Sequence, residues 1–151
     1  MEQEDNRRRD TTTNPTSRLK QREFSIVYTN AQSVLKKMDE LRCYVAERNP
    51  DMILLTETWT NDTVSDDFLK LKGYEIIARN DRVDTAGGRG GGVLVYARKE
   101  INCWKEEKES GFNQSVSVRV KIGKTTEMAV HVVLRASKTL FQYSGWIPGR
   151  I

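Results

Sequence analysis

The segment FSIVYTNAQSVLKKMDELRCYVAERNPDMILLTE, residues 24–57, decides the fold of this chain. Its first residues, 24–28, are β-branched and aromatic, and they predict a short buried strand that ends at Asn30. Residues 52–56 are apolar on both faces, which is typical of a parallel strand covered on both sides. The two runs therefore predict a pair of buried strands on either side of a connecting segment.

A helix is predicted in this connecting segment, over residues 33–48. Apolar residues recur there at steps of three and four. Ser33 is placed to cap the helix, and Asn49-Pro50 is placed to stop it. Strand, helix and strand together predict a βαβ unit.

Further strands are predicted downstream. Residues 74–78 and 92–97 have strand character on either side of a Gly-rich loop. Residues 116–122 and 128–134 alternate between apolar and polar side chains, and Gly123-Lys124 supplies the turn of an antiparallel hairpin. The fold class is therefore α/β: a mixed sheet with an N-terminal βαβ unit and an antiparallel continuation, as in the open half of an α/β sandwich.

Length and composition indicate one domain with a polar excess, since 37% of the 151 residues are hydrophobic and 30% are charged. Residues 1–22 are predicted to form a disordered polar leader. The apolar runs are far shorter than the ~20 residues needed to cross a bilayer, which excludes an integral membrane protein. The charged N-terminus lacks the apolar stretch of a secretory signal, so we expect an intracellular protein, with nucleus and cytoplasm not distinguished. Cys43 and Cys103 belong to no CxxC motif and are expected to be free thiols.

Two polar residues follow the strands of the βαβ unit. In a right-handed unit the carboxyl ends of the two strands emerge side by side, and here these ends carry Asn30 and Glu57. One carboxylate with one carboxamide is a start to a Mg²⁺ site, because this ion takes oxygen ligands and one or two carboxylates. The alternative is that Asn30 closes its strand through an Asx turn and Glu57 is a solvated rim residue.

A Gly-rich stretch at residues 87–92 carries a second candidate function. It precedes a strand rather than a helix, which excludes a phosphate-binding loop of the Walker or dinucleotide type. Arg79, Arg82 and Arg89 flank or lie in this loop, where they are candidates to contact a nucleic-acid backbone. A surface loop with incidental charge is the alternative.

The remaining polar and aromatic residues exclude other chemistry. His131 is the only histidine and lies in mid-strand, so Ser-His-Asp, Cys-His and HExxH sites are excluded. It is expected to pack or to make one hydrogen bond within the sheet. Trp59 is a candidate either to wall a DNA groove or to cover the sheet edge, and cover is favoured.

The chain contains several motifs within residues 24–134: residues 26–33 (IVYTNAQS), residues 51–59 (DMILLTETW), Gly73-Tyr74, Arg79, Arg82 and residues 90–93 (GGGV). Together these motifs resemble the endonuclease/exonuclease/phosphatase superfamily. The similarity extends over residues 24–134, and it is strongest to the apurinic-type endonuclease domain of non-LTR retrotransposons. This resemblance implies a four-layer α/β sandwich, Mg²⁺ as cofactor, DNA as partner, no small-molecule cofactor and cleavage of phosphodiester bonds. It also implies that Glu57 is the metal-binding catalytic carboxylate and that Asn30 belongs to the metal or phosphate network.

The chain also departs from that family. Residues 134–137 are Leu-Arg-Ala-Ser where the family has a Tyr-Arg-x-Pro segment, and the later Asp-x-Asn and Ser-Asp-His motifs do not occur. Residues 23–134 are therefore expected to form the N-terminal part of such a domain, followed by a divergent or truncated tail at 135–151. We expect a phosphodiesterase fragment without activity.

Two further consequences follow from a partial domain. The first is an alternative function, a non-catalytic nucleic-acid-binding module that uses the basic Gly/Arg loop and the tail. The second concerns folding, because a chain that carries mainly one sheet would leave an apolar face exposed. A broad, low thermal transition is expected in that case. The remaining alternative is an interaction domain whose exposed sheet pairs with a missing partner half.

Overall fold

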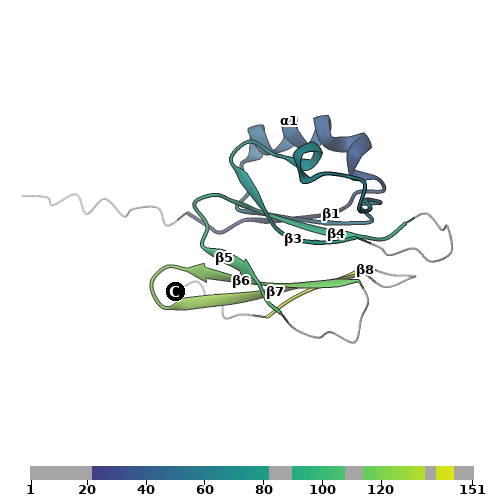
Figure 1. Cartoon of the computed structure of the whole chain (residues 1–151). Helices are drawn as coiled ribbons and strands as arrows, with labels where there is room; N and C mark the ends of the chain where they lie inside the picture. The colour runs from purple at the N-terminus through teal and green to yellow at the C-terminus, as the bar shows by residue number, and fades with distance from the viewer. Residues whose placement is uncertain (1–21, 82–89, 108–113, 135–138, 145–151) are drawn as a thin grey trace, which may run out of the picture.

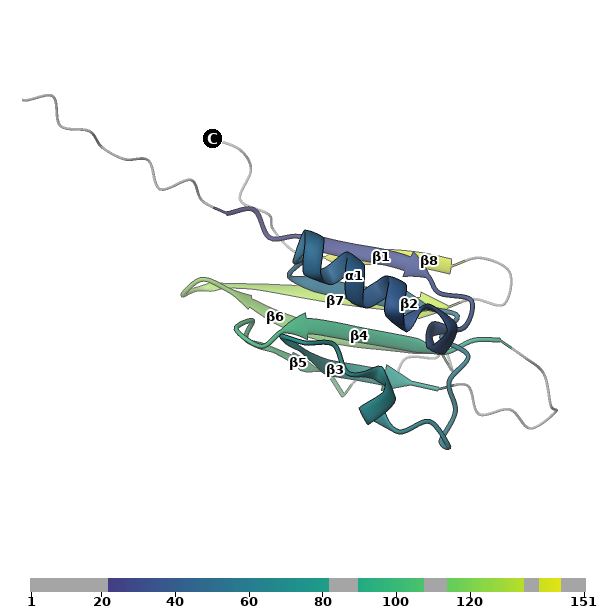
Figure 2. The same ribbon diagram turned by 90° about the horizontal axis from the view of Figure 1, so that it is seen from above.

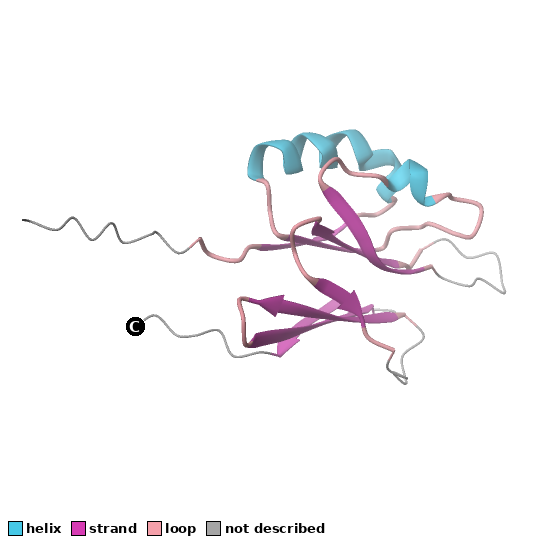
Figure 3. Cartoon of the chain, turned by 60° about the vertical axis from the view of Figure 1, so that its left-hand side comes forward, coloured by secondary structure: helices cyan, strands magenta, loops and turns pink. Residues whose placement is uncertain are grey.

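The computed structural model describes residues 22–81, 90–107, 114–134 and 139–144. A helical layer lies on one face of a first sheet, and a second sheet lies on the other face (Figure 1). Figure 3 distinguishes the same layers by element type. The predicted α/β class with a βαβ start is therefore confirmed. No helix in the described part of the chain has the length and apolar character needed to span a membrane.

The first sheet, called sheet A, is mixed and has the strand order β1-β2-β4-β3. Strands β1 and β2 are parallel, with Asn30 opposite Thr56, and the other neighbours are antiparallel. All five residues of β2 are buried, as its apolar character predicts. The strands are β1 (Ile26–Asn30), β2 (Met52–Thr56), β3 (Tyr74–Asn80) and β4 (Val93–Arg98).

The crossover between β1 and β2 is helical, as predicted, but its start differs. A 3-10 turn, η1 (Val34–Lys37), leads into α1 (Met38–Arg48). Ser33 does not cap the helix: its φ is 82° and its side chain makes no capping hydrogen bond. The backbone is held here instead by N–H groups of Ser33 and Val34, which donate to the carbonyls of Glu57 and Thr58 at 3.0 Å.

The end of α1 agrees with the sequence. Asn49 adopts the left-handed conformation with φ 46°, its N–H donates to Val45 O at 2.9 Å, and Pro50 follows. The helix lies over sheet A beside the β1–β2 pair (Figure 2). Its buried residues Met38 and Val45 join a core with side chains of β2 and β4 and of the short helix η2 (Asp66–Leu69).

The second sheet, called sheet B, is antiparallel and has the order β5-β6-β7-β8. The predicted hairpin forms its centre as β6 (Ser115–Ile122) and β7 (Thr126–Leu134), with Val118 opposite Val130. Two strands were not predicted. These are β5 (Cys103–Lys105), which pairs with β6, and β8 (Thr139–Ser144), which pairs with β7 from within the segment predicted to be a tail.

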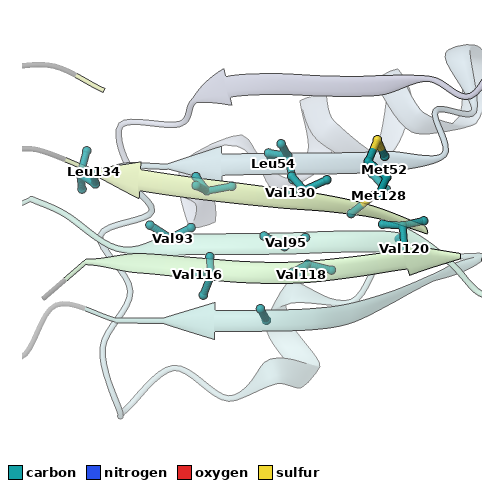
Figure 4. Close-up of a cluster of buried hydrophobic side chains, with 13 residues drawn as sticks. Met52, Leu54, Val93, Val95, Val116, Val118, Val120, Met128, Val130 and Leu134 are labelled. Atoms are coloured by element: carbon teal, nitrogen blue, oxygen red, sulfur yellow. The ribbon is translucent and has the colours of Figure 1, made fainter. Parts of the chain in front are cut away.

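Sheets A and B pack face to face and bury a shared apolar core (Figure 4). Met52, Leu54 and Val95 from sheet A meet Val118 and Val130 from sheet B, and all five side chains are fully buried. The expected exposure of one apolar sheet face is therefore wrong, because this chain supplies the inner faces of both sheets. A missing partner is not needed to cover either inner face, and the expectation of a broad, low thermal transition loses its physical basis.

Candidate functional site

The two predicted site residues lie at the ends of neighbouring parallel strands. Asn30 is the last residue of β1 and is exposed, and Glu57 directly follows the last residue of β2. The Ala31 N–H donates to Thr56 O at 2.8 Å, which extends the pairing of the strands past Asn30. Within the described residues no hydrogen bond joins the Asn30 amide to Glu57, and its side chain forms no Asx turn there. The Asn30 amide is thus presented to solvent beside the strand that leads to Glu57.

The backbone around Glu57 adopts an uncommon conformation. Glu57 and Trp59 have φ values of 53° and 56°, in the left-handed region that bulky side chains rarely occupy. Each such residue costs on the order of 1–3 kcal/mol unless the surroundings fix it. Here the facing Gly-rich segment fixes it, since the N–H groups of Thr58 and Trp59 donate to Gly92 O at 3.4 Å and Gly91 O at 3.0 Å.

The carboxylate of Glu57 is held by two N–H donors on one oxygen. Oε2 accepts the Trp59 indole Nε1–H at 2.9 Å and the Gly91 backbone N–H at 2.7 Å. Oε1 accepts no hydrogen bond from the described residues. Glu57 is half-buried, so the alternative of a solvated rim residue does not describe it. The carboxylate is therefore held through Oε2, while Oε1 has no N–H donor among the described residues.

Thr58, Thr60 and Asp81 form a hydrogen-bonded series close to Glu57 that was not predicted from the sequence. Thr58 and Thr60 are buried, and their hydroxyl oxygens lie 3.1 Å apart. Thr60 donates to Asp81 Oδ1 at 2.6 Å. Burial alone would raise the pKa of Asp81, but hydrogen bonds from Arg79 and Thr60 outweigh burial and lower it. The sequence signal that could have indicated this series is the placement of threonines at the alternate positions 56, 58 and 60.

Gly92 allows the Gly-rich segment to approach the buried threonines. Its φ is +93°, and a Cβ built on it would collide with the Thr58 Oγ1 atom. A side chain at this position would therefore displace the segment that supplies the N–H of Gly91 to Glu57. The glycine is required because its segment closely approaches the Thr58 side chain and because its φ is positive.

Arg79, predicted to contact nucleic acid, has its guanidinium surrounded by acceptors. Nε and Nη2 bind the carboxylate of Asp81 at 2.6–3.0 Å, while Nη1 contacts Asp66 at 2.6 Å and Val64 O at 2.8 Å. Nη2 also donates to Asn61 O at 2.8 Å, so all five N–H donors are used. The hydrogen bond to Asp81 is the main cause that raises the pKa of Arg79.

Through these contacts Arg79 links β3 to the loop at residues 61–66. Its side chain is 17% exposed, so a nucleic-acid contact would compete with internal partners. Arg82 and Arg89, the other two predicted contacts, lie outside the described residues. The nucleic-acid role of all three arginines stays a prediction.

The prediction for His131 is confirmed. It lies in β7, and its Nδ1 is 2.8 Å from Ser117 Oγ on the neighbouring strand β6. This pair belongs to sheet B, whereas Glu57 follows a strand of sheet A. Cys43 and Cys103 are both free, as expected.

Few side-chain oxygens are available to bind the predicted Mg²⁺. No group of three or more His, Cys, Asp or Glu side chains that could hold a metal occurs within the described ranges. Glu57 Oε1 and the exposed Asn30 amide remain as oxygen donors. One carboxylate and one amide fit an ion that keeps most of its water ligands, as Mg²⁺ does, and do not form an all-protein cage.

No protein-family model matches this chain, and no curated protein matches its sequence. The similarity to the endonuclease/exonuclease/phosphatase superfamily therefore stays a prediction from the quoted motifs.

Proposed function

We propose that this chain is the N-terminal part of a Mg²⁺-dependent phosphodiesterase domain of the retroelement endonuclease type. It retains the metal-binding carboxylate, Glu57, but does not cleave the phosphodiester bond by itself. The observation that carries the proposal is the position of Glu57 at the end of β2, where two N–H groups bond Oε2 and no described residue donates to Oε1. Asn30, at the end of the adjacent parallel strand, would supply the second oxygen.

The proposed division of roles follows from the chemistry of the side chains. A bound Mg²⁺ would supply charge to polarise a phosphate oxygen. Glu57 would hold the cation through Oε1, and the Asn30 amide would orient one of its water or phosphate ligands. Cleavage also requires a group that takes a proton from the attacking water. The only histidine is hydrogen-bonded to Ser117 in sheet B, and the described residues contain no group of three or more His, Cys, Asp or Glu side chains that could hold a metal.

Calorimetric titration with Mn²⁺, a carboxylate-binding substitute for Mg²⁺, tests the metal site. The wild-type chain should bind Mn²⁺ weakly, and Glu57→Gln should weaken binding by roughly tenfold or more. Glu47→Gln is the matched control, because Glu47 is exposed on α1 and is not part of the site. Equal Mn²⁺ affinity in the wild type and Glu57→Gln would refute the assignment of Glu57.

Incubation of supercoiled plasmid with Mg²⁺ tests the absence of cleavage. The plasmid should stay intact with the wild-type chain. Nicking that disappears in Glu57→Gln would show that the chain is an active nuclease and would overturn the non-catalytic part of the proposal.

Binding to labelled DNA at increasing salt tests the nucleic-acid partner. Contacts to phosphates release counterions, so the affinity should fall steeply as the salt concentration rises. An absence of binding at low salt, or binding insensitive to salt, would remove DNA from the proposal.

A further inference from the structure

We propose that Trp59 sets the cation preference of this site by making Glu57 a monodentate ligand, which favours Mg²⁺-sized ions over Ca²⁺. This inference rests on the proposed metal-binding role of Glu57. It adds a specificity-determining residue that does not itself contact the cation.

The number of acceptor positions on Oε2 is the first step. A carboxylate oxygen offers two lone-pair positions, and a carboxylate offers about four in total. On Oε2 the two positions are taken by the Trp59 indole N–H and the Gly91 amide N–H, at 2.9 and 2.7 Å. Bidentate coordination needs both oxygens of the carboxylate. With Oε2 occupied, Oε1 alone is available to a cation.

The second step is the different coordination of the two ions. Ca²⁺ accepts six to eight oxygen ligands in flexible geometry and is often bound by a bidentate carboxylate. Mg²⁺ requires a near-ideal octahedron at about 2.0–2.1 Å, keeps several waters and binds single carboxylate oxygens. A Glu57 restricted to Oε1 therefore withholds from Ca²⁺ a ligand that Mg²⁺ does not need.

The third step is that Trp59 cannot easily move away from Glu57. The Trp59 backbone N–H donates to Gly91 O at 3.0 Å, while the Gly91 N–H donates to the Glu57 carboxylate. The three residues thus form a closed ring of hydrogen bonds at the end of β2. Of the two donors to Oε2, only the indole belongs to a side chain, so it is the donor that substitution can remove.

The test compares Mn²⁺ and Ca²⁺ affinities of the full chain by calorimetry, with Trp59→Phe as the main variant. Phenylalanine keeps an aromatic ring and lacks the N–H. The ratio of Mn²⁺ to Ca²⁺ affinity should fall roughly threefold to tenfold in Trp59→Phe, with Ca²⁺ affinity rising, because Oε2 regains a free lone pair. Trp104→Phe is the matched control, since Trp59 and Trp104 are both 41% exposed and Trp104 lies in β5 of the other sheet.

The ratio of affinities separates a specificity role from a merely structural one. A loosened site would lose affinity for both ions and leave their ratio unchanged, and that result would overturn the proposal. If Trp59→Phe does not fold, a benzothienylalanine at position 59 keeps the shape of the indole without its N–H, and the same fall in ratio is expected. A wild-type chain that binds no Mn²⁺ would overturn both proposals. If the wild-type chain binds Mn²⁺ but neither Trp59→Phe nor benzothienylalanine at position 59 changes the ratio of Mn²⁺ to Ca²⁺ affinity, only the proposal about Trp59 is overturned.

Discussion

Replacement of Asp51 by asparagine should strongly destabilise the chain. The Asp51 side chain is 4% exposed and contacts two arginines through Oδ1, Arg98 at 2.8 Å and Arg22 at 3.1 Å. Its Oδ2 accepts the Ser25 N–H at 2.8 Å and the Ser25 hydroxyl at 3.1 Å. One buried carboxylate therefore ties the segment before β1 to the ends of β2 and β4.

The magnitude follows from what asparagine removes. Breaking a buried ion pair from one side costs about 3–5 kcal/mol, because the remaining charge stays buried without its partner. Arg98 is 14% exposed, and its buried Nε has no hydrogen-bond partner among the residues that the structure describes. Asparagine keeps one acceptor and turns an N–H₂ group toward donors, so the free energy of unfolding should fall by about 3 kcal/mol. With a urea slope of about 1–3 kcal/mol/M, the midpoint should fall by at least ~1 M.

Urea unfolding followed by circular dichroism measures this change. Asp39→Asn is the control, because the pair of Asp39 with Arg42 is on the surface and the Asp39 side chain is 99% exposed. That exchange should leave the midpoint almost unchanged. If Asp51→Asn and Asp39→Asn unfold at the same urea concentration, the network around Asp51 does not stabilise the fold.

Three further results are expected. Leu54→Ala removes a fully buried side chain between the sheets and should lower the free energy of unfolding by about 2–5 kcal/mol, as measured by urea denaturation; a change under about 0.5 kcal/mol would contradict face-to-face packing. Gly92→Ala should destabilise more than Gly123→Ala in thermal melts, since both have positive φ but only the Cβ at 92 meets a neighbouring side chain. Burial and the charge of a nearby glutamate raise the pKa of the Cys103 thiol to about 11. Because the thiolate reacts, iodoacetamide should label exposed Cys43 first, and the rate at Cys103 should keep rising up to that pH; equal rates at mildly alkaline pH would argue against this burial.

The strands were predictable where burial leaves a regular pattern. Residues 52–56 are apolar on both faces because sheet A is covered by the helical layer and by sheet B. The β6–β7 hairpin alternates because most residues of its inner face are buried, whereas most residues of its outer face are partly exposed. The three-residue strand β5 is too short to give a period, and β8 gave no comparable pattern. The stacking of the two sheets was missed because an apolar face does not specify which surface will cover it.

The site was predictable in position but not in detail. Asn30 and Glu57 were predicted to lie at adjacent strand ends because a parallel βαβ pair dictates this position. Contacts between distant segments, such as Gly91 with Glu57, depend on the tertiary path of the chain and have no local signal. The prediction that Ser33 caps the helix was wrong for a related reason. Long-range backbone hydrogen bonds hold that turn in a positive-φ conformation.

The strand order of sheet A has a consequence for synthesis on the ribosome. Strand β4 inserts between β2 and β3, so β2 gains its second neighbour only when residues 93–98 have left the exit tunnel. Until then the nascent chain exposes a strand of four apolar residues and one threonine with an open edge, which is a template for association with other chains. Residues 39–67, which include β2, carry eight acidic and two basic side chains, and their net negative charge would oppose such association by repulsion. Slow codons before residue 98 should therefore lower the soluble yield more than slow codons after residue 98.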